Sequence, residues 1–217
     1  MSDTEVFREV DEDYRRDRMI AFWRRHGWLV MVFVGLSLAA AAGLQYLHQR
    51  NQAEQAAQTT TLDQLINLAT PGNELRAADA LAAFAAKADK GHAILARLTE
   101  ASLRQRMGNL GGASALYHAI ADDGSVEQNM RDLAIVRLGY IAVDQPNPEP
   151  LIPRLAPIAS KDSPWRYSAK EAMALLTARA GQKASAATQF SEIAQDPGAP
   201  PDLAQRARDL ADFYRRN

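Results

Sequence analysis

Two segments of the chain share one spacing of small and large residues: 101–120 reads ASLRQRMGNLGGASALYHAI, and 174–193 reads ALLTARAGQKASAATQFSEI. When Gly108 is aligned with Gly181, four further positions match in kind: Ala101 with Ala174, Ala113 with Ala186, Tyr117 with Phe190, and Ile120 with Ile193. Small residues are needed where two helices cross with their axes about 8–10 Å apart, and a large apolar residue then fills the space beside the crossing. The pattern therefore predicts two helix pairs, each joined by a turn at its glycine.

The rest of the region after residue 51 has the same helical character. Alanine and leucine dominate, apolar residues recur at helical spacing, and clusters of glycine, proline and aspartate interrupt the chain at regular intervals. No segment shows the alternation and β-branched enrichment of a strand. The sequence predicts an all-α, tetratricopeptide-like solenoid of about nine helices. We expect four helix pairs near 52–89, 92–122, 126–160 and 164–196, and a capping helix from Pro201 to Arg215. The alternative is another all-α bundle, since alanine-rich helices match such patterns by chance.

An uncharged stretch, GWLVMVFVGLSLAAAAGLQYL at 27–47, precedes the solenoid. A helix needs roughly 20 mostly apolar residues to cross a hydrocarbon core of about 30 Å. Trp28 and Tyr46 stand near the two ends, where amphipathic rings favour the headgroup level. The stretch predicts a single transmembrane helix. The alternative is a cleaved signal peptide with a small-residue cleavage site near 39–42, although the stretch is longer than a usual signal core.

Basic residues are distributed unequally around this stretch. Six arginines precede it within residues 1–26, whereas only Arg50 follows before Arg76. Because basic residues near a membrane helix favour the cytoplasmic side, we expect the N-terminus inside and the C-terminus outside the cytoplasm. The predicted division is a cytoplasmic head at 1–26, a transmembrane helix at 27–47 and an external domain at 48–217. Apolar residues at helical spacing, beginning with Phe7 and Val10, predict an amphipathic helix in the head.

The composition limits the classes of function. The 217 residues include 25 basic and 26 acidic residues and no cysteine. The head holds six of the basic and seven of the acidic residues, so the remainder is balanced, and we expect no nucleic-acid partner. The lack of cysteine excludes disulfides, thiolate metal sites and a cysteine nucleophile.

Residue types that carry chemistry occur without the spacing of a catalytic or metal site. The histidines at 26, 48, 92 and 118 form no pattern such as H-E-x-x-H, and we interpret His92 and His118 as surface or packing residues. The segment GNLGG at 108–112 lacks the preceding strand and the lysine of a phosphate-binding loop, so it predicts a turn. We therefore expect a protein that is not an enzyme and that binds neither cofactor nor metal.

Two sets of residues are candidates for binding. The first helices of stacked pairs line a concave groove, which predicts a partner-binding groove formed by Leu95, Leu98, Ser102, Gln105, Ser168, Glu171 and Leu175. The alternative is that the apolar members belong to the core. In the membrane helix, Gly35, Ala39 and Gly43 recur every four residues, which predicts a packing face for a second transmembrane helix. The alternative there is chance, because the span is rich in alanine.

The order of these parts resembles a known family. FREVDEDYRRDRMIAFWRRHGW at 7–28 leads into the apolar stretch, and degenerate repeats follow, with RDLAIVRLGYIAVD at 131–144 and PDLAQRARDLADFY at 201–214. Nearly the whole chain is similar to the tetratricopeptide-like inner-membrane proteins of Gram-negative bacteria that are ancillary subunits of the SecYEG translocon. The resemblance implies a periplasmic repeat domain that associates with the translocon and with periplasmic chaperones. It brings no catalytic residue, and the proline-interrupted helix at 148–159 departs from a regular repeat.

The sequence thus predicts a membrane-anchored scaffold that binds other proteins at the outer face of the bacterial inner membrane. The anchor would raise the local concentration of the groove near a channel exit. The alternative is a structural accessory subunit of another inner-membrane complex, in which the groove binds no transient client.

Overall fold

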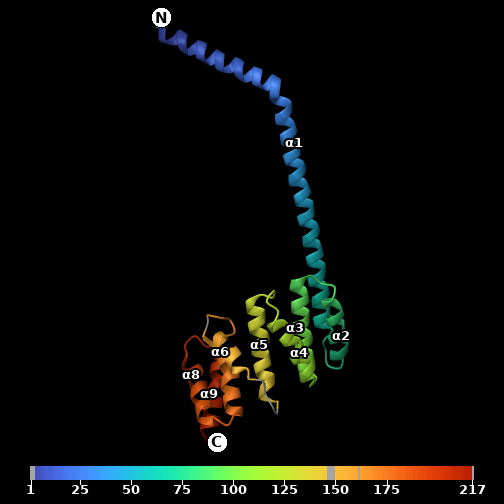
Figure 1. Ribbon diagram of the computed structural model, residues 1–217, viewed down its shortest axis with the longest axis vertical. Helices are drawn as coiled ribbons and strands as arrows, with labels where there is room; N and C mark the ends of the chain where they lie inside the picture. The colour runs from blue at the N-terminus through green and yellow to red at the C-terminus, as the bar shows by residue number, and fades with distance from the viewer. Residues whose placement is uncertain (1–2, 146–149, 161, 217) are drawn as a thin grey trace. The chain divides into compact units, whose positions relative to one another are not determined.

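The computed structural model describes residues 3–145, 150–160 and 162–216, and side chains from Arg24 onward except at 25, 26, 29, 30 and 34. In this part of the chain every regular element is an α helix (Figure 1). The helices are α1 (Asp3–Asn67), α2 (Glu74–Ala85), α3 (Lys90–Arg106), α4 (Leu110–Ala121), α5 (Gln128–Val143), α6 (Ile152–Ser160), α7 (Arg166–Arg179), α8 (Lys183–Gln195) and α9 (Pro201–Arg216). The predicted all-α class is confirmed. The chain divides into two compact units, Met1–Ala57 and Gln58–Asn217.

The first unit contains helix α1 as far as Ala57, and this part of the helix displays the apolar stretch 27–47 on its surface. The segment Met31–Asn67 is long and apolar enough to cross a membrane, and none of its most apolar window is buried. Phe33 is 73% exposed and Leu44 is 69% exposed. Apolar surface in water costs about 25 cal/mol per Å² relative to an apolar environment. The helix therefore favours lipid or an apolar partner around this segment.

The predicted boundaries at residues 26 and 47 both fall inside α1, so no break in secondary structure marks them. Between Leu44 and Asn67 the sequence contains neither glycine nor proline, and the helix ends just before the Pro71-Gly72 turn. The first helix of the first predicted pair is therefore the end of α1. In the described chain eight helices follow α1, where the sequence suggested about nine. The apolar face predicted for the head lies on side chains outside the described set.

The second unit is a stack of helices that follow one another in space as in sequence (Figure 1). The four predicted pairs are the end of α1 with α2, which share a core cluster through Leu62, then α3 with α4, α5 with α6, and α7 with α8, and α9 covers α8 as the cap. Three core clusters run along the stack. The first joins Leu62 of α1 to α2 and α3, the second extends from α3 to α7, and the third joins α7, α8 and α9. Each cluster is shared only between near neighbours, as in a solenoid.

The two aligned glycines make the same turn. Gly108 has φ +78° and Gly181 has φ +83°, a left-handed conformation that glycine adopts without strain. In both turns the glycine N–H and the next N–H close a Schellman motif, through the pairs Gly108–Gln105, Asn109–Arg104, Gly181–Ala178 and Gln182–Thr177 at 2.9–3.1 Å. This motif satisfies carbonyls at the end of the first helix and redirects the chain into the second helix.

The residues aligned around these glycines are all buried. Ala101, Ala113, Ala174, Ala186 and Phe190 are 0% exposed, and Tyr117, Ile193 and Ile120 are 1–2% exposed. Both pairs thus use small residues at the crossing and one aromatic residue beside it. The two aromatic rings have different contacts. The Tyr117 hydroxyl lies 3.1 Å from the Ser102 hydroxyl, whereas Phe190 stacks on Tyr214 of α9 with 5.8 Å between ring centroids.

The third pair departs from the pattern, as its prolines predicted. Helix α6 is only nine residues long and contains Pro157, which cannot donate a backbone hydrogen bond. It packs against α7 more than against α5, and α5 reaches α7 directly. Gly139 of α5 permits this approach, because a Cβ at that position would lie 3.1 Å from both the Ala172 Cβ and the Leu155 Cδ1. The short α6 therefore brings the first helices of two pairs into contact.

Candidate functional site

A cavity of about 530 Å³ lies where α3, α5, α7 and α9 come together. Helices α3, α5 and α7 are the first helices of three successive pairs, and α9 is the cap, so the cavity occupies the face on which the sequence predicted a groove. Its lining consists of Gln105 from α3, Leu133, Val136, Arg137 and Tyr140 from α5, Trp165 ahead of α7, Ser168, Glu171 and Leu175 from α7, and Arg206 and Leu210 from α9. We call this cavity the groove.

Four of the seven residues predicted for the groove line it, namely Gln105, Ser168, Glu171 and Leu175. The other three lie elsewhere. Leu98 is 8% exposed and belongs to the second core cluster, and Ser102 contacts Tyr117. Leu95 is 44% exposed and lines a different cavity of about 460 Å³, between the start of α3 and the start of α5. Binding of a partner at any of these residues stays a prediction.

A buried carboxylate lies at the centre of the groove. Glu171 is 2% exposed, and it accepts two hydrogen bonds from Arg206, from Nε to Oε1 at 2.5 Å and from Nη2 to Oε2 at 3.0 Å. The Tyr140 hydroxyl donates to the same Oε2 at 2.6 Å. A buried charge is tolerated only when it is paired and hydrogen-bonded in this way. The three residues therefore tie α5, α7 and α9 together along the groove.

The same contacts fix the protonation states of the partners. Burial, followed by the hydrogen bond to Glu171, raises the pKa of Tyr140 above its ordinary value. Hydrogen bonding to Glu171 raises the pKa of Arg206, against a smaller opposing effect of burial. The tyrosine therefore remains a neutral donor and the arginine remains a cation throughout the physiological range. This network has the character of a structural support rather than of an acid–base pair, which needs a pKa near the working pH.

Among the seven lining residues that sequence reasoning missed, four carry polar groups, namely Arg137, Tyr140, Trp165 and Arg206. A signal existed for three of them, because Leu133, Arg137 and Tyr140 recur at helical spacing on α5, and Arg206 and Leu210 do so on α9. The three residues on α5 lie on one face of that helix, and the two on α9 lie on one face of theirs. Both faces combine apolar and polar residues. Trp165 gave no such signal. Its indole Nε1 donates to the Asn129 carbonyl at 2.8 Å, which holds the start of α7 against the start of α5.

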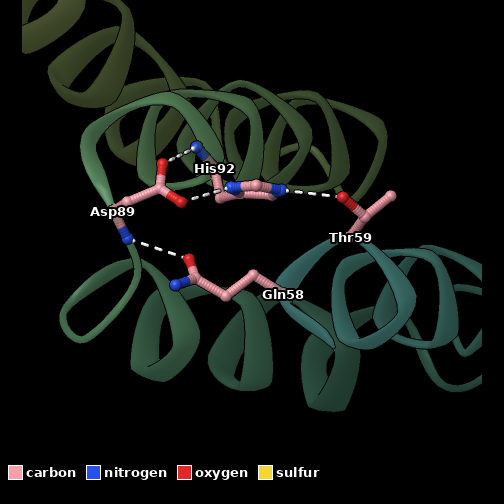
Figure 2. Close-up of polar contacts among 4 residues, drawn as sticks. All are labelled: Gln58, Thr59, Asp89 and His92. Atoms are coloured by element: carbon pink, nitrogen blue, oxygen red, sulfur yellow. Dashed lines mark hydrogen bonds and ion pairs between the residues drawn. The ribbon is translucent and has the colours of Figure 1, made fainter. Parts of the chain in front are cut away.

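A second polar cluster joins the end of α1 to the start of α3 (Figure 2). Asp89 caps α3, with Oδ1 accepting from the His92 N–H at 3.1 Å and Oδ2 2.7 Å from Nδ1 of the same residue. The other ring nitrogen, Nε2, lies 3.0 Å from the Thr59 hydroxyl, and the Asp89 N–H donates to Gln58 Oε1 at 2.9 Å. The backbone N–H of His92, and then its side chain, lower the pKa of Asp89 and keep the cap ionised.

The order Asp89, His92, Thr59 is that of a hydrolase triad, but the surroundings favour a structural role. Thr59 lies in the interior of a long helix, where backbone N–H groups bond carbonyls of the preceding turn. Helix α1 therefore offers no free amides near the hydroxyl to stabilise an oxyanion. The cluster is better understood as a clamp between two helices. In this clamp His92 joins the start of α3 to α1 through Thr59.

The remaining site predictions concern the membrane helix and metals. Gly35, Ala39 and Gly43 are all exposed, and within the described chain nothing lies within 4 Å of a Cβ added at either glycine. Their role as a packing face stays a prediction. The described residues contain no group of three or more histidine, aspartate or glutamate side chains that could hold a metal.

The fold defines a helical-repeat protein. A family model described as a tetratricopeptide repeat-like domain matches residues 21–199, and the chain belongs to that family. The match includes the apolar stretch 27–47 and ends before α9 begins. No curated protein and no solved structure matches the chain at a significant level. Domains of this class are typically non-catalytic scaffolds that bind other proteins.

Proposed function

We propose that this protein is a single-pass membrane protein whose repeat domain holds partner polypeptides in the groove. The observation that carries the proposal is the groove itself, which three successive first helices and the cap α9 build in a chain that also displays an exposed apolar helix. Its mixture of apolar side chains with arginine, serine and glutamine suits a polypeptide, which brings both apolar and polar groups. The mechanism is binding at a raised local concentration beside a membrane complex.

The finer proposal places the repeat domain in the periplasm of a Gram-negative bacterium, next to the SecYEG translocon and its chaperones. The excess of arginine before the stretch 27–47 supports this orientation. The family match also supports a retained anchor, because it covers the apolar stretch and the repeats together. The choice of the SecYEG translocon as the complex rests on the resemblance to its ancillary subunits in the order of head, apolar stretch and repeats.

Orientation is tested with a reporter enzyme fused after residue 217. Alkaline phosphatase is active only outside the cytoplasm, so we expect high phosphatase activity from this fusion in a Gram-negative host. Moving the arginines at 24 and 25 to positions just after Leu47 is the matched control and should lower that activity, because the charge asymmetry is then reduced. Low activity from the unaltered fusion would place the domain in the cytoplasm and end the periplasmic proposal.

The partner is tested with a photo-crosslinking amino acid at Leu210, which lines the groove. Phe213 on the same helix is 56% exposed and does not line the groove, so the same substitution there is the control. In intact cells we expect crosslinks to translocon subunits or periplasmic chaperones from position 210 and few from position 213. Crosslinks only to subunits of another membrane complex would favour the accessory-subunit alternative. Equal crosslinking from positions 210 and 213 would show that the partner does not bind specifically in the groove.

A further inference from the structure

The groove carries more positive than negative charge. Two arginines, Arg137 and Arg206, line it together with one carboxylate, Glu171. Glu171 is already bonded by Arg206 and Tyr140, so it has little capacity left for a second cation. A guanidinium has five N–H donors, and Arg206 spends two of them on Glu171. The remaining donors of Arg206, with its side chain 55% exposed, are available to a ligand.

Arg137 indicates recognition of a negatively charged group more strongly than Arg206 does. It is exposed, and among the described residues it makes no ion pair or hydrogen bond. It lies on α5 in the middle of the groove, with Gln105 of α3 on one side and residues of α7 and α9 on the other. A chain that crosses the groove would therefore pass Arg137 rather than end at it. The neighbouring lining is apolar, with Leu133, Leu175 and Leu210.

We infer that the groove selects an extended partner segment that presents an aspartate or glutamate side chain to Arg137, with leucine-sized apolar side chains on either side. This inference rests on the proposed function and specifies the chemistry of the partner. The carboxylate of the partner would accept two charge-assisted hydrogen bonds from the guanidinium of Arg137 in a bidentate ion pair. Arg206 would add a second positive charge nearby. The flanking apolar side chains would fill the surface between the helices.

The test uses the full-length protein in detergent micelles and fluorescein-labelled, C-terminally amidated peptides read by fluorescence anisotropy. The probe has one central glutamate between leucines. The comparison peptides replace that glutamate with glutamine or lysine, or carry the only carboxylate at a free C-terminus. We expect the glutamate peptide to bind about fivefold more tightly than the glutamine peptide, the upper end of the range for an exposed ion pair. Empty micelles give the background.

The matched variants are Arg137→Gln and Arg179→Gln, both exposed arginines, of which only Arg137 lines the groove. The first should abolish the preference for glutamate, and the second should retain it. Arg137→Glu should reverse the preference towards the lysine peptide. Four outcomes would each overturn the inference. They are equal binding of the glutamate and glutamine peptides, loss of the preference for glutamate in both variants, tighter binding of the peptide with the C-terminal carboxylate, and no binding of any peptide. Groove crosslinks from position 210 would still stand in those cases, so the failure is separable from that of the proposed function.

Discussion

Replacing Phe190 with alanine is expected to destabilise the last three helices by about 3–5 kcal/mol, the cost of removing a fully buried phenylalanine from a packed core. Phe190 is 0% exposed, belongs to the third core cluster and stacks on Tyr214 with an angle of 5° between the rings. The alanine would leave a cavity bounded by α7, α8 and α9, which rigid helices cannot close. The loss should also loosen the groove, because α9 carries Arg206.

The measurement is amide hydrogen exchange on the full-length protein, resolved by helix. Because solenoid stability is shared mainly between neighbours, exchange should accelerate in α7 to α9 and change little in α2 and α3. Phe213→Ala is the control, because that ring is 56% exposed and contacts Tyr214 edge-on at 5.1 Å. It should cost at most about 1 kcal/mol. Uniform acceleration along the whole domain after Phe190→Ala would show a single cooperative unit instead of a solenoid.

The helix pairs were predictable because their signals are local. Gly108 and Gly181 adopt positive φ, which few other residues tolerate, and the alanines and aromatics around them recur at fixed offsets. The same locality explains the prediction of the cap and of the irregular α6. By contrast, no residue near position 47 indicated that α1 continues there. The polar segment after residue 47 could have formed a separate helix or extended the apolar one. The structure continues it.

The groove was predictable only in part, because its composition depends on how each helix is rotated against the next. Gln105, Ser168, Glu171 and Leu175 follow from the alignment of the two glycines. Leu98 has the same spacing and yet belongs to the second core cluster, which extends from α3 to α7. The partners of Glu171 lie 31 and 35 residues away in sequence. Nothing in a single sequence pairs residues so far apart.

Replacing Arg206 with alanine is expected to lower the free energy of unfolding by about 2–3 kcal/mol. The substitution leaves Glu171, at 2% exposure, with only the Tyr140 hydroxyl as a described side-chain partner. A buried charge without its counterion is strongly destabilising, typically by about 3–5 kcal/mol. We expect the lower part of that range or less, because the Arg206 side chain is 55% exposed and water would enter in its place. Urea unfolding of the full-length protein in micelles measures the loss.

A double-mutant cycle separates the ion pair from simple packing. The cycle compares Glu171→Gln, Arg206→Gln and the double variant, which removes both charges and keeps two side chains that can hydrogen-bond. The double variant should lose less stability than the sum of the two single losses, with a coupling energy of about 1–3 kcal/mol. Arg208→Ala is the matched control on the same helix. Arg208 is exposed and bonds only Gln205 three residues earlier among the described residues, so its removal should change stability by about 0.5 kcal/mol or less. If Arg206→Ala and Arg208→Ala cost the same, the buried carboxylate does not depend on Arg206, and the groove is held together by its apolar contacts alone.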